Sequence, residues 1–260
     1  MSTSDFVWYE LMTSDAKAAA AFYAAVVGWT LADAGMPDPY LLLKVGDRQV
    51  GGVMDVPPDA AAMGVKPGWI GYVSVGDTDA ATSAAKAAGA AVRMEPTDIP
   101  GVGRFSVIAD PGGARLCLFT GKGDPAPDLP PMANGSIGWH ELMTDDPAAA
   151  WTFYESQFGW TKGDALDMGP MGTYQLFSTK GATGMDMMSG GMMKALPDMP
   201  NLGWLYYFVV DDIDAAVTRV TDNGGTLTVG PMEVPGGAWI IQANDPQGAP
   251  FALVGMRAAS

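Results

Sequence analysis

The stretch FVWYELMTSDAKAAAAFYAAVVGWT, residues 6–30, occurs a second time as IGWHELMTDDPAAAWTFYESQFGWT, residues 137–161. The shared residues of the first copy, each with a counterpart at the same spacing in the second, include Trp8, Glu10, Leu11, Met12, Thr13, Asp15, Phe22, Tyr23, Gly28 and Trp29. Self-similarity over a segment of this length is typical of a duplicated structural unit. We therefore expect two copies of one fold.

The repeated stretch has the pattern of a strand followed by a helix. Residues 6–13 alternate between two faces, as in a half-buried strand. Asp15 stands at a helix N-cap position, and the alanine-rich run 16–27 ends at Gly28. Short apolar runs with Gly, Pro and Asp turns then predict three strands, at 29–33, 40–45 and 49–54. The predicted unit is βαβββ.

The same order of elements follows directly in the chain. We expect a strand at 69–75, a helix at 77–88 capped by Asp77 or Asp79, and strands at 91–95, 103–109 and 115–120. The second copy matches this pattern, so the prediction is an α+β fold of four βαβββ modules in tandem. The Pro- and Gly-rich residues 121–136 predict a linker between a first domain, residues 1–120, and a second, residues 137–257.

Composition limits the classes of partner and site. The formal net charge of −15 among 260 residues disfavours nucleic acid and anionic membrane as partners. No apolar run approaches the roughly 20 residues that cross a bilayer, and the first residues lack the features of a signal peptide, so we expect a cytoplasmic protein. Cys117 is the single cysteine, which excludes an intramolecular disulfide and a cysteine-cluster metal site.

The motifs WYELMTSDAKAAAAFY with DPGGARLCLF, and WHELMTDDPAAAWTFY with DPQGAPFALV, resemble those of the glyoxalase/bleomycin-resistance superfamily, the vicinal oxygen chelate proteins. They are most similar to two-repeat bacterial members variously labelled glyoxalase-like, hydroxylase-like or, in mycobacteria, an antigen. The resemblance implies that paired modules form two curled, cup-shaped mixed sheets with flanking helices, and that the concave faces hold a small ligand. Whether modules pair within a repeat or between repeats stays open.

The resemblance also implies metal ligands at particular motif positions, which this sequence fills with unsuitable residues. The first ligand position falls on Trp8 and Trp139, and an indole nitrogen has no lone pair for a cation. The second falls on Ile70 and Leu205, and the closing glutamate is replaced by Cys117 and Ala252. For the remaining acidic position, the nearest carboxylates are Asp55 and Asp186. We expect no metal and no cofactor, because a divalent site needs three or four converging donors.

Two glutamates are the candidate catalytic residues. Strand alternation places Glu10 and Glu141 on the concave face, beside Trp8 and Trp139. A buried carboxyl group can act as a general acid or base or anchor a ligand, while the structural alternative is a glutamate satisfied by backbone amides, by nearby tyrosines or by an arginine. His140, the only histidine, alternates to the opposite face, which favours a structural role.

The candidate ligand-binding residues are mainly aromatic. They are Trp8, Tyr72, Arg104, Trp139, Tyr207 and Trp239. Arg104 aligns with Trp239. If Arg104 reaches the first cup, that cup would suit an anionic or carbonyl ligand, whereas the second cup, with Trp239, would suit a flat apolar ligand.

The sequence therefore favours a metal-free protein that binds a small, largely apolar organic molecule for sequestration or resistance. Two alternatives stay open. One is a metal-dependent glyoxalase-type lyase or isomerase, or a dioxygenase, with ligands such as Glu10, Asp55, Glu141 and Asp186. The other is a metal-free acid/base enzyme that uses Glu10 or Glu141. We expect either a monomer with an internal pseudo-dimer or a homodimer.

Overall fold

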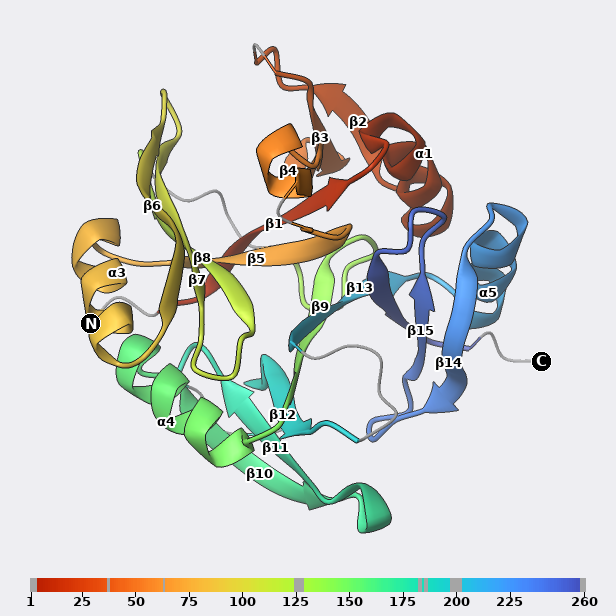
Figure 1. Ribbon diagram of the computed structural model, residues 1–260. Coiled ribbons are helices and arrows are strands. Elements are labelled where there is room, and N and C mark those ends of the chain that lie inside the picture. The colour runs from red at the N-terminus through yellow and green to blue at the C-terminus, as the bar shows by residue number, and fades with distance from the viewer. Residues whose placement is uncertain are drawn as a thin grey trace. The chain divides into compact units, whose positions relative to one another are not determined.

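The computed structural model describes residues 4–36, 38–62, 64–123, 129–181, 184, 187–196 and 203–257. Two eight-stranded mixed sheets form, with helices packed on them (Figure 1). The first has the order β2-β3-β4-β1-β5-β8-β7-β6, and the second has the order β10-β11-β12-β9-β13-β16-β15-β14. These findings confirm the α+β prediction, and each sheet takes its strands from one repeat.

The elements follow the predicted order closely. Those of the first repeat are β1 (Phe6–Thr13), α1 (Ala16–Val27), β2 (Thr30–Asp33), β3 (Tyr40–Val45), β4 (Arg48–Asp55), α2 (Pro58–Ala62), β5 (Gly68–Ser74), α3 (Thr78–Ala87), β6 (Ala91–Ile99), β7 (Gly103–Ala109) and β8 (Arg115–Gly121). Those of the second are β9 (Ile137–Thr144), α4 (Pro147–Phe158), β10 (Thr161–Asp167), the 3-10 turn η1 (Gly169–Met171), β11 (Thr173–Ser178), β12 (Gly190–Lys194), β13 (Gly203–Val210), α5 (Ile213–Asp222), β14 (Thr226–Glu233), β15 (Trp239–Asn244) and β16 (Pro250–Gly255). The short α2 was not predicted.

Aspartate caps begin the four long helices. Asp15 and Asp146 cap α1 and α4, and Asp77 and Asp212 cap α3 and α5, each by accepting an amide hydrogen bond in the first turn. Asp77 rather than Asp79 is therefore the cap of α3. At the other end, α1 and α4 stop at glycines in the left-handed conformation, as the sequence predicted.

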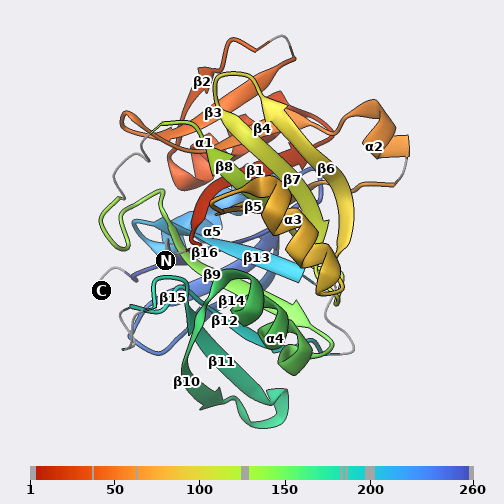
Figure 2. The same ribbon diagram turned by 90° about the vertical axis from the view of Figure 1, so that its left-hand side faces the viewer.

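The chain divides into two compact units, each of which combines modules from different repeats. Unit 1 comprises Met1–Trp8, Ile70–Ala126 and Trp139–Trp204, and unit 2 comprises Tyr9–Trp69, Pro127–Gly138 and Leu205–Ser260. In unit 1 helix α3 lies along β6 and β7 (Figure 2) and also contacts α4. In unit 2 α1 contacts α5, so helices of different repeats meet within each unit.

A hydrogen-bonded chain with a buried tyrosine and a buried aspartate joins the two repeats inside each unit. In unit 1 the Trp204 Nε1–H donates to the Tyr154 hydroxyl at 3.0 Å, and that hydroxyl donates to Asp110 Oδ2 at 2.8 Å. In unit 2 Trp69, Tyr23 and Asp245 repeat this arrangement with distances of 2.9 and 3.3 Å. We call these the Trp–Tyr–Asp chains. Both connect the tyrosine of one repeat to the Asp-Pro turn of the other.

The chemistry of the three groups fixes the direction of each Trp–Tyr–Asp chain. An indole nitrogen can only donate, so the tyrosine oxygen accepts and its single hydrogen goes to the aspartate. Tyr23 is fully buried, and burial together with Asp245 holds its pKa well above the usual range, so the hydroxyl remains a donor. Burial likewise raises the pKa of Asp245. The hydrogen bonds that Asp245 accepts lower this pKa, but their effect is smaller than that of burial.

Two further tryptophans hydrogen-bond to the backbone just before the first strand of the opposite repeat. Trp29 Nε1–H donates to the Gly135 carbonyl at 2.8 Å, just before β9. Trp160 Nε1–H donates to the Ser4 carbonyl at 2.7 Å, just before β1. The Gly-Trp motif of each repeat therefore positions the opening strand of the other.

Among the described residues, no helix combines the length and apolar character needed to cross a membrane.

Replacement of Tyr154 tests the Trp–Tyr–Asp chain of unit 1. We expect Tyr154→Phe to lower the free energy of unfolding by about 1–3 kcal/mol, because the buried Asp110 carboxylate and the half-buried Trp204 indole each lose a hydrogen-bond partner. Urea denaturation measures the change, and Tyr23→Phe provides the matched variant in unit 2. A change below about 0.5 kcal/mol, the usual range for surface substitutions, would contradict the stabilising role.

Candidate functional site

A tyrosine hydroxyl holds each of the two candidate glutamates. In unit 2 the Tyr40 hydroxyl on β3 donates to Glu10 Oε2 on β1 at 2.9 Å. In unit 1 the Tyr174 hydroxyl on β11 donates to Glu141 Oε2 on β9 at 3.0 Å. Glu141 is buried and Glu10 is half-buried. We call these the Tyr–Glu pairs; they show that the repeats share one carboxylate arrangement.

A glycine makes room for each Tyr–Glu pair. Gly52 on β4 lies opposite Glu10, and Gly191 on β12 lies opposite Glu141, in the parallel register. A Cβ atom on Gly52 would overlap the Tyr40 ring, and one on Gly191 would overlap the Tyr174 ring. The tyrosine therefore crosses an intervening strand at a position that has no side chain.

The second repeat extends its Tyr–Glu pair by one residue. Trp139 Nε1–H donates to the Tyr174 hydroxyl at 2.7 Å. The indole can only donate, so Tyr174 accepts from Trp139 and directs its own hydrogen to Glu141. Trp139, Tyr174 and Glu141 thus form a hydrogen-bonded series with a fixed direction, and the indole ring stands next to the carboxylate.

His140 lies on the opposite face of β9, as strand alternation predicted. Its ring stacks on Phe6 with centroids 4.1 Å apart, in an aromatic cluster that reaches Tyr154 of α4 through Trp160. Nδ1 lies 2.7 Å from the Ser189 carbonyl oxygen, so this nitrogen carries the hydrogen. Burial lowers its pKa to about 4, which keeps the imidazole neutral. This geometry gives His140 a structural role.

The remaining predicted residues divide between two faces of the sheets. Tyr72 stacks on Phe105 at 6.0 Å in unit 1, and the Tyr207 hydroxyl accepts from Gln242 Nε2 at 2.9 Å in unit 2. Both tyrosines are buried, and Trp8 on β1 is half-buried.

Arg104 and Trp239 lie instead on the helix-bearing face. Arg104 Nε is 2.6 Å from Asp79 in the first turn of α3, and Nη1 is 3.0 Å from Asp98 on β6. These carboxylates raise the pKa of Arg104, and Arg104 lowers that of Asp79. The guanidinium is therefore committed to α3 and β6, and the expectation that it equips the first cup for an anion has no support from its position.

The second repeat fills the same place in a different way. Trp239 carries the guanidinium of Arg257 over its ring at 3.7 Å, and Arg257 Nε pairs with Asp214 in the first turn of α5 at 2.6 Å. Asp79 and Asp214 occupy equivalent positions of α3 and α5, so in each repeat an arginine pairs with the aspartate at this helix position. Trp239 thus supports this ion pair.

The donors at the family's ligand positions do not fit a divalent metal. The Trp139 Nε1–H donates a hydrogen bond to Tyr174 and has no lone pair for a metal. The side chains of Ile70, Leu205 and Ala252 have no atom that coordinates a metal. Only the buried Cys117 could coordinate. In the described part of the chain, His, Cys, Asp and Glu form no group of three or more suited to a metal ion. Asp186 lies outside the described residues.

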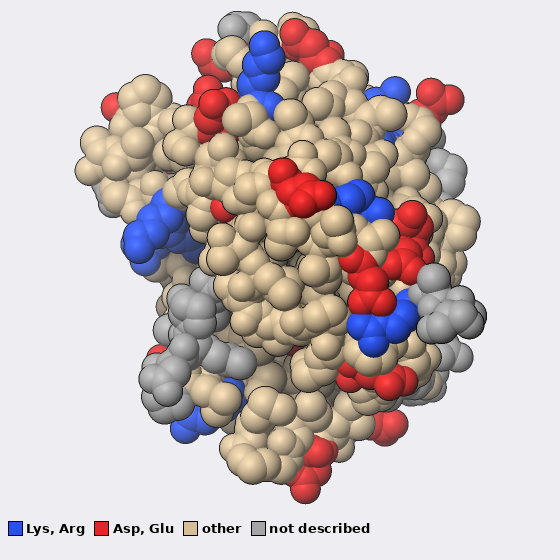
Figure 3. Space-filling view, turned by 90° about the vertical axis from the view of Figure 1, so that its right-hand side faces the viewer, with Lys and Arg blue, Asp and Glu red and all other residues tan. Residues whose placement is uncertain are grey.

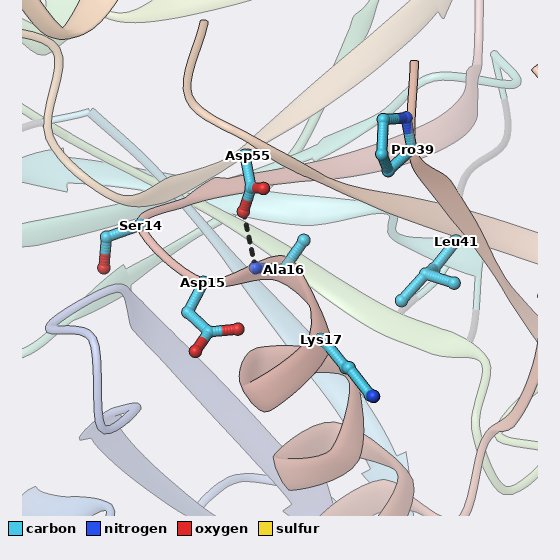
Figure 4. Close-up of a pocket in the computed structure, with 7 residues that line it drawn as sticks. All are labelled: Ser14, Asp15, Ala16, Lys17, Pro39, Leu41 and Asp55. Atoms are coloured by element: carbon cyan, nitrogen blue, oxygen red, sulfur yellow. Dashed lines mark hydrogen bonds between the residues drawn. The ribbon is translucent and has the colours of Figure 1, made fainter. Parts of the chain in front are cut away.

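Asp55, the other carboxylate considered as a ligand, has a structural contact. It lines a depression of about 370 Å³ beside the start of α1, together with Ser14, Asp15, Ala16, Lys17, Pro39 and Leu41 (Figure 4). Its Oδ1 accepts from the Ala16 amide at 2.7 Å, while Asp15 accepts from the Ala18 amide at 2.9 Å. Two carboxylates already occupy this helix start, which therefore does not attract an anion.

Sequence reasoning missed Tyr40 and Tyr174 as the partners of the glutamates. The available signal was a tyrosine in the middle strands of each repeat followed by a Gly-Gly pair, Gly51-Gly52 or Gly190-Gly191. The first glycine of each pair approaches the backbone carbonyl of Tyr9 or His140, and the second admits the tyrosine ring. A doubled glycine in a strand indicates such close approach.

Comparison with known proteins decides the family. The model of the Glyoxalase/Bleomycin resistance protein/Dioxygenase superfamily matches residues 5–118 and 136–253. The chain belongs to this superfamily. The 2,3-dioxygenase LapB from Pseudomonas sp. KL28 shares the fold, with a TM-score of 0.67 over 99% of this chain and 94% of LapB at 13% identity.

Two relatives are similar in sequence to this superfamily member. The anthracycline biosynthesis protein DauV of Streptomyces sp. is 30% identical over 268 residues, which cover 97% of this chain and 93% of DauV. CFP32 of Mycobacterium tuberculosis is 45% identical over 119 residues, covering 45% of this chain and 44% of CFP32. Similarity to DauV therefore extends over both repeats.

The low pKa of His140 predicts a loss of stability in acid. The unfolded chain takes up the proton first, so the free energy of unfolding falls as the pH drops from 6.5 through about 4. The full loss is about 3 kcal/mol at about 1.4 kcal/mol per pKa unit. Denaturation of the parent and His140→Phe across this range isolates the effect, since the carboxylates are common to both. A pH-independent difference between the two proteins contradicts it.

Gly191→Ala tests the packing of the Tyr–Glu pair. We expect the added methyl to displace the Tyr174 ring and to lower the free energy of unfolding by about 1–3 kcal/mol. Gly68→Ala is the matched control, because a Cβ there meets no atom within 4 Å. Chemical denaturation compares the variants, and equal stability of the two would show that the glycine is not required by the tyrosine.

Proposed function

We propose that this protein binds a small, largely apolar aromatic molecule through its own side chains rather than through a metal. The observation that carries the proposal is the series Trp139, Tyr174 and Glu141, with contacts of 2.7 and 3.0 Å. It combines an aromatic ring with a carboxylate whose orientation is fixed by a second residue. Apolar surroundings with few oriented polar groups are typical of small-molecule sites.

The first repeat supports a second site of the same kind. Tyr40 donates a hydrogen bond to Glu10, as Tyr174 does to Glu141. Gly52 leaves room for the Tyr40 ring, as Gly191 does for the Tyr174 ring. Trp8, Tyr72 and Tyr207 remain proposed stacking residues, on their aromatic character and their place in the sheets. Arg104 and Trp239 are left out, because their contacts lie with α3 and α5.

The chemistry of the family's ligand positions supports recognition without a metal. Indole and aliphatic groups occupy places where a cation would need lone pairs, which leaves apolar surface suited to an organic ring. The similarity to DauV points in the same direction, because its name assigns it to anthracycline biosynthesis, and anthracyclines are flat polycyclic aromatic compounds. We therefore propose polycyclic aromatic molecules as the ligand class.

Tryptophan fluorescence titrated with polycyclic aromatic quinones and phenols tests this function. We expect saturable quenching, because the ligand ring would lie close to Trp139. Trp139→Phe should remove part of the quenching and weaken binding at least fivefold. The matched control Trp239→Phe, on the helix-bearing face, should bind like the parent.

The same titration can contradict the proposal. If no compound gives saturable quenching, the proposed function is wrong. It is also wrong if Trp139→Phe and Trp8→Phe both bind the compounds as tightly as the parent protein does. Elemental analysis of the purified protein supplies an independent check, since a stoichiometric, tightly held Mn, Fe, Ni or Zn would show that the metal-free assignment is wrong.

A further inference from the structure

The polar group of each proposed site is a hydrogen-bond acceptor. Tyr174 donates to Glu141 Oε2 at 3.0 Å, and Tyr40 donates to Glu10 Oε2 at 2.9 Å. In the second repeat the indole of Trp139 enforces this direction, because the tyrosine oxygen accepts from it. An ionised carboxylate has acceptor positions only. A ligand group that meets either glutamate in this form is therefore a donor.

Two arginines, Arg104 and Arg257, are committed to the helix-bearing face. Arg104 pairs with Asp79 at 2.6 Å, and Arg257 pairs with Asp214 at 2.6 Å, both at the first turn of a helix. Each arginine thus compensates a helix carboxylate on the helix-bearing face. These two guanidiniums, which are natural partners of a carboxylate or phosphate, are therefore occupied by side chains of the protein.

The field of the whole molecule favours the same sign of ligand. The formal net charge is −15, and acidic side chains lie scattered over the face seen in Figure 3. Such a charge raises the local concentration of cations and repels anions before contact. Trp139 adds a short-range term, since an ammonium group near an indole face is attracted by the ring quadrupole.

Resting on the proposed function, we propose that the ligand is a flat aromatic compound that carries a protonated amino group. The aromatic ring packs on Trp139, and the ammonium hydrogens are received by the carboxylate of Glu141. The pair of Glu10 and Tyr40 receives the same group in the first repeat. The sites select for the amine and against an acid built on the same ring.

Isothermal titration calorimetry with three naphthalene probes tests this selection. The probes are 2-(2-naphthyl)ethylamine, its N-acetyl amide and 2-naphthylacetic acid, which share the ring and differ in charge. We expect the amine to bind at least tenfold more tightly than the amide or the acid at neutral pH. Binding of the amine should also weaken with added salt, because part of the attraction comes from the net charge.

Charge-neutral variants locate the selection on the two glutamates. The double variant Glu10→Gln, Glu141→Gln should bring the affinity for the amine to within about twofold of that for the amide. Glutamine keeps the oxygen that accepts from each tyrosine, so the variant is expected to fold. Glu155→Gln, an exposed residue of α4, makes the same kind of charge change away from the sites and should retain the preference.

The outcomes separate this inference from the proposed function. Equal or tighter binding of the acid or the amide overturns the inference and leaves aromatic binding intact. A preference for the amine that survives in the double variant also overturns it, because the selection then lies elsewhere. No saturable heat with any of the three probes overturns the proposed function and this inference together.

Discussion

The Trp–Tyr–Asp chains are the constraint on which the structure depends. In each, an indole N–H donates to a tyrosine hydroxyl and that hydroxyl donates to an aspartate, with contacts between 2.8 and 3.3 Å, and each joins one repeat to the other. Each aspartate accepts backbone amides of its own turn on Oδ1, and the helix tyrosine of the other repeat supplies a partner for the buried Oδ2. Trp29 and Trp160 add a second connection by binding the residues that precede β9 and β1.

The repeated residues therefore serve two different purposes. The tyrosine, the Gly-Trp pair and the Asp-Pro turn are repeated because each copy completes the packing of the other. Glu10 and Glu141 are repeated together with Tyr40 and Tyr174, and with the glycines that admit those rings. The first group accounts for the stability of the fold, and the second supplies the polar chemistry of the proposed sites. Repetition alone does not distinguish them, whereas the hydrogen-bond partners do.

The two faces of the sheets hold different polar groups. Arg104 and Arg257 pair directly with Asp79 and Asp214 at the helices, and in the second repeat Trp239 also lies beneath the arginine. The glutamates lie on the opposite face, held by tyrosines. This separation explains why an arginine that looked like an anion receptor in the sequence contributes to helix packing instead, and why acceptor chemistry dominates the proposed sites.

The sequence by itself determined the duplicated βαβββ pattern, the helix caps and the structural place of His140, because these follow from local periodicity, turn chemistry and strand parity. It also showed that indole and aliphatic groups fill the family's ligand positions. Only the tertiary structure decided that Tyr40 and Tyr174 hold the glutamates, that Arg104 and Trp239 belong to the helix-bearing face, and that Tyr23 and Tyr154 reach the other repeat. These contacts join residues far apart in the chain, and strand register and helix packing set them rather than local sequence.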